Sequence, residues 1–223
     1  MTEFTRDLTL HRLHAPAPDS LVFLFHGYGA DGHDLLDLGQ QWRQLLPRTT
    51  FIAPNASDAC EINPAGFQWW SLADVMQNGI TPDMALRESG AEAVRAEVMA
   101  LIDRERQALA LPWGKVALVG FSQGAMIALH VGLRLPEAPA AILGYSGMLL
   151  APQLLPQIRV KPPVMLVHGM MDMVVPFAAL NMAEVALRQN GFAVESVTCP
   201  QLGHGINQTG LQRGGAFLRQ HLS

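Results

Sequence analysis

The chain has 223 residues, of which 49% are hydrophobic and 15% are charged, and its formal net charge is −4. This length suffices for one globular domain with an ample core, over residues 1–223. The slightly acidic balance and the scattered arginines argue against nucleic-acid binding. Two cysteines, Cys60 and Cys199, are too few for a disulfide framework or a cysteine metal site. We expect free thiols, although one pairing between them stays open.

Neither the first residues of the chain nor its most apolar stretch predicts export or membrane insertion. Residues 1–7 lack the apolar core of a signal peptide. Residues 138–158 carry no charge, but they are interrupted by Gly144, Gly147, Pro152 and Pro156, which predicts a buried strand and an apolar loop. We therefore expect a cytoplasmic protein without stable membrane insertion.

The first quarter of the chain predicts three strands and a helix. Residues 7–14 alternate as an edge strand does, and Leu21–Phe25 is an uninterrupted apolar run typical of a buried parallel strand. Leucines and a tryptophan spaced three and four apart predict an amphipathic helix over residues 35–45, which Pro47 stops. Phe51–Ala53 predicts another short strand.

Residues 55–80 form a long connection with little periodicity, a length at which loops usually carry function. The connection contains two adjacent tryptophans, Trp69 and Trp70. Since neighbouring side chains on a regular element point in different directions, we expect one to anchor the loop and one to line a binding site. The alternative is that both pack inside the loop.

A long helix is predicted next. Thr81-Pro82-Asp83 combines a capping residue, a proline at the first helical position and an early acid. The apolar stripe that follows indicates a helix lasting to about Leu109, and its members are Val94, Val98, Leu101 and Ile102.

The most informative stretch joins a buried strand to a helix through a G-x-S-x-G segment. The apolar run 115–119 leads into Gly120-Phe121-Ser122-Gln123-Gly124, and a helix-forming run continues to Leu135. This is the setting of a nucleophile elbow, in which Ser122 sits on a strained turn between two residues without side chains. The positive N-terminus of the next helix favours a developing negative charge. The alternative is a chance strand–turn–helix with a buried serine.

The rest of the chain alternates strands and helices. Apolar runs predict strands over 140–145, 163–168 and 193–199, and helices are predicted over 177–189 and 207–221. The last helix contains three glycines, which should weaken it. The loop after the first of these strands carries Met148 and Leu149, which we expect to contact an acyl chain.

A catalytic acid and base can be chosen by elimination, because on this architecture they follow the nucleophile in the order acid, then histidine. After Ser122 the chain has a single aspartate, Asp172, in the loop that follows a buried strand, whereas the glutamates are predicted on helix or strand surfaces. Of the two later histidines, His221 is two residues from the end, and His204 lies in a loop between glycines. Asp172 and His204 are the candidates, and a loop-tip histidine without a role is the alternative.

Two main-chain N–H groups are expected to hold an oxyanion. One belongs to Gln123, directly after the nucleophile, and the other to Tyr28, in the loop after the early strand. His26 precedes the nucleophile, so we interpret it as a residue that orders the turn.

Three methionines flank the candidate acid: Met170, Met171 and Met173. Methionine adapts to irregular apolar space, so they predict either a tolerant acyl pocket or packing beneath the loop. Among them we choose Met173 as a candidate substrate contact.

With these segments in view, the chain resembles the small α/β-hydrolase family of carboxylesterases, lysophospholipases and acyl-protein thioesterases. The matching segments run in the family's order over nearly the whole chain, and they are 26–31, 120–124, 146–147, 168–176 and 203–205. Residues 56–80 depart from the family, with a longer segment at 60–64, and this leaves the substrate open.

The strand and helix patterns predict an α/β-hydrolase fold, a doubly wound and mostly parallel sheet with helices on both faces and no separate cap domain. The expected activity is that of a serine carboxylesterase acting on small or single-chain esters without metal or cofactor. A lysophospholipase or acyl-protein thioesterase is the alternative, and a non-catalytic binding scaffold is the alternative from another class. The resemblance also implies homodimers, with the apolar loops 55–80 and 147–155 as the candidate interface.

Overall fold

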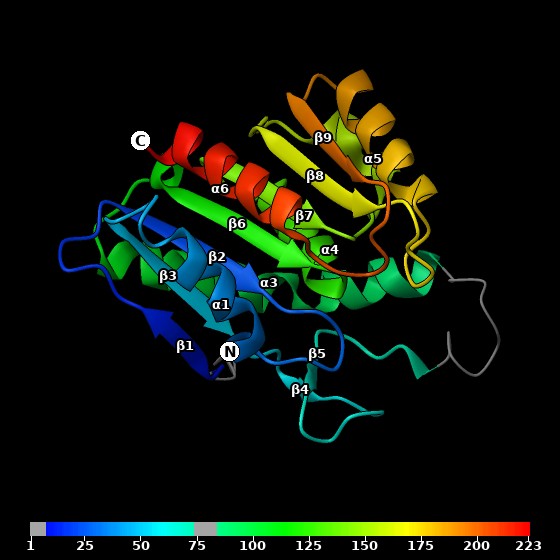
Figure 1. Ribbon diagram of the computed structural model, residues 1–223, viewed down its shortest axis with the longest axis horizontal. Helices are drawn as coiled ribbons and strands as arrows, with labels where there is room; N and C mark the ends of the chain where they lie inside the picture. Colours follow the sequence, from blue (N-terminus) through cyan, green and yellow to red (C-terminus); the bar gives the residue numbers. More distant parts are fainter. Residues whose placement is uncertain (1–7, 74–83) are drawn as a thin grey trace.

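The computed structural model describes residues 8–73 and 84–223. Seven strands form the central sheet in the order β1-β3-β2-β6-β7-β8-β9 (Figure 1). β1 pairs antiparallel with β3, and the other neighbours in this sheet pair in parallel. The strands are β1 Leu10–Leu13, β2 Ser20–Phe25, β3 Thr49–Pro54, β6 Val116–Phe121, β7 Ala141–Tyr145, β8 Val164–Gly169 and β9 Val194–Cys199. This is the predicted doubly wound, mostly parallel sheet.

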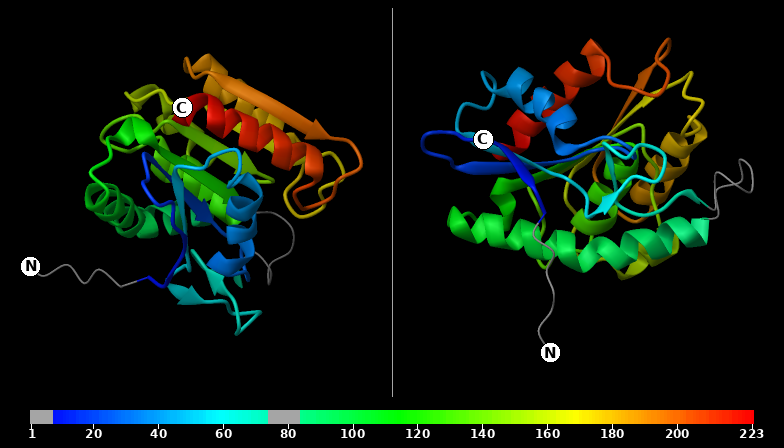
Figure 2. Two further views of the ribbon diagram at one scale, coloured as in Figure 1. Left: turned by 60° about the vertical axis from the view of Figure 1, so that its left-hand side comes forward. Right: turned by 90° about the horizontal axis from the view of Figure 1, so that it is seen from below.

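Helices cover both faces of the sheet, as predicted. In Figure 2, α1 (Gly32–Trp42) and α6 (Gln208–Leu222) lie on one side, with α3 (Met84–Ala108) and α4 (Gln123–Gly132) on the other. α5 (Ala178–Gln189) packs in the same core as α3 and α4. Each face of the sheet has its own hydrophobic core. The side chains of β2 alternate between the two cores, and β2 is buried throughout. A strand covered on both faces is apolar at consecutive positions, which explains the uninterrupted runs in the sequence.

The helix predicted over 35–45 begins earlier, at Gly32, because a capping box starts it. The Asp31 side chain accepts hydrogen bonds from the N–H groups of His33 and Asp34, and the Asp34 carboxylate accepts from the N–H of Asp31. These contacts satisfy N–H groups that have no intrahelical acceptor.

The glycines of α6 have a steric reason. A Cβ atom at Gly214 would overlap the Tyr145 hydroxyl, and one at Gly215 would lie 2.7 Å from the Trp42 ring. The predicted weakening of the helix is thus offset by close packing of α6 on the sheet and on α1.

The long connection after β3 contains a small antiparallel hairpin of two-residue strands, β4 (Asp58–Ala59) and β5 (Phe67–Gln68). Elsewhere, short 3₁₀ helices occupy Trp113–Lys115 and Pro152–Gln157. The predicted helix start at Thr81–Asp83 lies outside the described residues. Within the described part of the chain, no helix is long and apolar enough to cross a bilayer.

Candidate active site

The candidate residues lie in loops that leave the carboxyl ends of four parallel strands (Figure 1). Tyr28 follows β2, Ser122 follows β6, Asp172 follows β8 and His204 follows β9. Because parallel strands end at the same edge of a sheet, residues distant in sequence meet there.

Ser122 occupies a strained turn, as the elbow prediction requires. Its φ and ψ are 55° and −117°, a region that side-chain-bearing residues rarely adopt, and α4 begins at the next residue. A Cβ atom at Gly120 would overlap the Gly124 carbonyl, and one at Gly124 would overlap the carbonyl of Phe25. The two glycines therefore permit the tight turn and its approach to β2.

This strain predicts a stability difference between two variants that both lack the hydroxyl. We expect Ser122→Gly to have a free energy of unfolding about 1 kcal/mol higher than Ser122→Ala, because relief of strain exceeds the added flexibility of the unfolded chain. Denaturant titration of both variants measures the difference. An alanine variant as stable as the glycine variant would show that the turn stores no strain.

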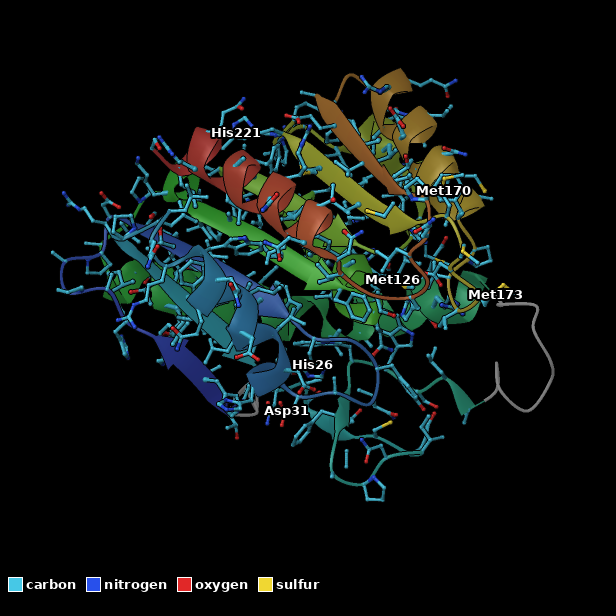
Figure 3. The ribbon with its side chains drawn as sticks, in the orientation of Figure 1. His26, Asp31, Met126, Met170, Met173 and His221 are labelled. Atoms are coloured by element: carbon cyan, nitrogen blue, oxygen red, sulfur yellow. The ribbon has the colours of Figure 1, made fainter. Side chains whose placement is uncertain are left out.

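The structure brings Ser122, His204 and Asp172 into one hydrogen-bonded chain. Nε2 of His204 lies 2.9 Å from Oγ of Ser122, and Nδ1 of His204 lies 2.8 Å from Oδ2 of Asp172. His221, the other histidine considered, lies near the C-terminal end of α6 (Figure 3), where its ring makes an edge-to-face contact with Phe217. The elimination made from sequence order therefore selected residues that meet in space.

The carboxylate of Asp172 is buried but well supplied with donors. Oδ1 accepts hydrogen bonds of 2.9 Å from the N–H groups of both Val174 and Val175. Burial raises the pKa of Asp172, but the hydrogen bonds from His204, Val175 and Val174 outweigh it, and the pKa lies below its ordinary value. The carboxylate is therefore charged at neutral pH, and it accepts a hydrogen bond from the protonated Nδ1 of His204.

Two contacts hold the acid loop in place. The N–H of Met171 donates to the carbonyl of Leu202, which joins the loop of Asp172 to the loop of His204. Nε2 of the buried His168 donates to the carbonyl of Val175 at 2.9 Å and lies 3.4 Å from the Asp172 carboxylate. The sequence drew attention to His168 only through the family resemblance.

The two candidate oxyanion donors line the same cavity as Ser122. Gln123 is the first residue of α4, so its N–H has no acceptor within the helix. Tyr28 lies in the turn that His26 orders: Nδ1 of His26 donates to the Gly27 carbonyl, and Nε2 accepts from the N–H of Ala56. Burial lowers the pKa of His26, which agrees with this neutral ring.

The tryptophan prediction is wrong in its second half, because both side chains are buried and neither lines the cavity. Trp69 is 1% exposed, and its Nε1 donates to the carbonyl of His26. Trp70 is 6% exposed and packs against Gly90 of α3. The side chain of Gln123 explains why both turn inward, since it accepts from the N–H of Trp69 and donates to the carbonyl of Trp70.

A cavity of about 850 Å³ opens at Ser122 and His204. This volume lies in the range of small-molecule sites. Met173, the candidate substrate contact, is among the lining residues and is 92% exposed. Most of the wall is apolar, and it includes Leu35, Leu38, Ile62, Leu72, Phe121, Met126, Val174, Val175, Pro176 and Ile206.

Met148 and Leu149 do not line this cavity, so their prediction as acyl contacts is corrected. Leu149 is buried in the core shared by α3, α4 and α5, and Met148 packs against that core. The loop is drawn there because the Glu88 carboxylate on α3 accepts from the N–H of Ala151. Met170 is half exposed and, like the exposed Met171, lies outside the cavity wall.

Several wall residues were missed from the sequence. Leu35 and Leu38 were assigned to the buried side of a helix, but they are also part of the wall. Arg87 of α3 is a charged side chain in the cavity, and its position one turn before Ala91 on the buried stripe was the available signal.

Comparison with known proteins agrees with this architecture. A family model described as phospholipase/carboxylesterase matches residues 14–222. An acyl-protein thioesterase 1 of Gibberella zeae is 30% identical over 213 residues, which cover 90% of this chain and 90% of that protein. Esterase YpfH of Escherichia coli is 27% identical, covering 91% of this chain and 81% of its own length. The crystal structure of esterase PE8 superposes with a TM-score of 0.90 at 41% identity, covering 96% of this chain and 99% of that one. The chain belongs to the phospholipase/carboxylesterase family of α/β-hydrolase esterases.

Proposed function

We propose that the protein is a serine carboxylesterase in which Ser122, His204 and Asp172 form the catalytic triad. The observation that carries this proposal is the continuous hydrogen-bonded chain from Asp172 through His204 to Ser122, opening into an apolar cavity. The esterase relatives support the same class of reaction.

In the first half-reaction, Nε2 of His204 takes the proton from Oγ of Ser122, and Oγ attacks the acyl carbonyl carbon. The N–H groups of Gln123 and Tyr28 hold the resulting oxyanion. Asp172 keeps Nδ1 of His204 protonated and stabilises the imidazolium. The C–O bond to the alcohol then breaks, and His204 protonates the departing oxygen.

In the second half-reaction, water takes the place of the alcohol. His204 removes a proton from water, which attacks the acyl carbonyl, and the same N–H groups hold the second oxyanion. Collapse of this intermediate releases the carboxylic acid, and Oγ of Ser122 regains its proton from His204. Substrate-binding contacts are assigned to Met173 and the apolar wall of the cavity.

A lysophospholipase or acyl-protein thioesterase is the second candidate. The cavity volume and its mostly apolar wall favour it, since a single acyl chain can pack against such a surface. The thioesterase relative also supports it.

Hydrolysis of p-nitrophenyl esters from two to sixteen carbons separates these readings. We expect the largest kcat/KM at short chains, because the mouth at Met173 and Val174 is exposed and offers little apolar enclosure to a long chain. A maximum at twelve carbons or more would replace the carboxylesterase by the second candidate. Absence of turnover at every length would contradict both.

A further inference from the structure

Arg87 lies on the face of α3 that otherwise carries apolar side chains and packs against the core. The buried stripe of α3 runs through Ala91, Val94, Val98 and Ile102, and Arg87 continues it by one turn toward the N-terminus. The side chain of Arg87 is only 9% exposed and lines the cavity that contains Ser122. A guanidinium therefore replaces a core residue at the wall of the candidate active site.

The guanidinium has no partner among residues 8–73 and 84–223. Its Nε is buried without a hydrogen bond, and no carboxylate of this part of the chain forms an ion pair with it. Burial alone lowers its pKa, but an arginine remains charged at physiological pH. Unpaired buried charges are costly, so they are normally paired or bound to a ligand.

Another buried charge of α3 follows that rule. Glu105 is 8% exposed, and its carboxylate is 2.6 Å from the guanidinium of Arg12 and 3.3 Å from that of Arg104. The one carboxylate of the described cavity wall, Asp34, is exposed and already accepts from the N–H of Asp31. The difference between Glu105 and Arg87 is that Arg87 faces the cavity.

We propose that Arg87 binds an anionic group, a carboxylate or a phosphate, carried by the ester substrate at a distance from the scissile carbonyl. Guanidinium groups bind both anions through paired N–H donors, and such bonds are strong when shielded from water. The apolar wall contacts the hydrocarbon between the ester and the anion. This inference rests on the proposed esterase function and adds a charge preference to it.

The experiment compares esters that differ in one charge. Mono-p-nitrophenyl suberate and p-nitrophenyl octanoate place the carboxylate on the acyl side, and octanoyl-glycerol-3-phosphate and monooctanoylglycerol place a phosphate on the alcohol side. Release of p-nitrophenol or octanoate is followed for the wild type and for Arg87→Gln and Arg87→Lys. The responding pair identifies the side on which the anion is recognised.

We expect Arg87→Gln to lower the charged-to-neutral ratio of kcat/KM about 10- to 100-fold in one pair, mainly through KM. Arg87→Lys should retain part of the ratio, because it keeps the charge but not the paired donors. An unchanged ratio in both pairs overturns the inference.

Arg95→Gln is the matched control, because it removes the same charge from the same helix. Arg95 pairs with Glu92 at 2.8 Å and does not line the cavity, so the ratio should be unaffected.

If Arg87→Gln fails to fold, inhibition of the wild type by suberate, compared with octane-1,8-diol, gives an independent answer. Equal inhibition by the two overturns the inference. Wild-type hydrolysis of the neutral esters separately tests the proposed function.

Discussion

Replacing Ser122 by alanine is expected to lower kcat for p-nitrophenyl esters by about four to six orders of magnitude. The reason is that the attacking Oγ, 2.9 Å from Nε2 of His204, is removed while the rest of the site stays in place. Alanine keeps the Cβ atom and hence the backbone of the turn. Steady-state hydrolysis of the preferred ester by wild type and variant measures the effect.

Ser20→Ala is the matched control for this prediction. Ser20 is also a buried serine, hydrogen-bonded to Thr49 at 2.7 Å, but it lies at the amino end of β2, away from the candidate site. The control should change stability and leave kcat close to that of the wild type. A Ser122→Ala variant that keeps more than a tenth of the wild-type activity would refute the nucleophile assignment.

Asp172→Asn is expected to lower kcat about 10⁴-fold while leaving the fold intact. Asparagine has nearly the same shape, and its oxygen can still accept from the N–H groups of Val174 and Val175. Its amide N–H₂ then faces Nδ1 of His204, which can accept that hydrogen bond only when its proton has moved to Nε2. A histidine protonated at Nε2 cannot take the proton of Ser122.

The measurement is kcat at neutral pH, with circular dichroism and thermal unfolding to establish that the variant is folded. Asp103→Asn is the control, because it neutralises a partly exposed aspartate of α3 that pairs with Arg106. The triad assignment fails if Asp172→Asn is as active as Asp103→Asn. A variant that is inactive because it is unfolded would be recognised by the thermal measurement.

Much of the fold follows from local patterns in the sequence. The apolar runs at β2, β6 and β8 are uninterrupted because helices cover both faces of the sheet, and this marks them as central parallel strands. The strand-to-helix turn at Ser122 was visible in the sequence because the turn leaves no room for a Cβ atom at residues 120 and 124, and both are glycines. Boundaries moved by a few residues where a side-chain cap started the helix, as Asp31 does for α1.

The wall of the cavity was not predictable in the same way. Trp69 and Trp70 turn inward because Gln123, some fifty residues later in the chain, pairs with their backbone. Met148 and Leu149 are drawn away from the cavity to the core of α3, α4 and α5. These outcomes depend on contacts between segments that are far apart in sequence, and hydrophobic periodicity carries no information about such contacts.

The sequence by itself determined the strand–helix alternation and the turn at Ser122, because both depend on neighbouring residues. It also indicated Asp172 and His204, because the loops that follow parallel strands meet at one edge of the sheet. The tertiary structure alone decided which side chains reach the cavity. That choice depends on how loops from several strands and the start of α3 pack together, and it places Arg87 beside the apolar wall, at a position where periodicity alone predicts a core residue.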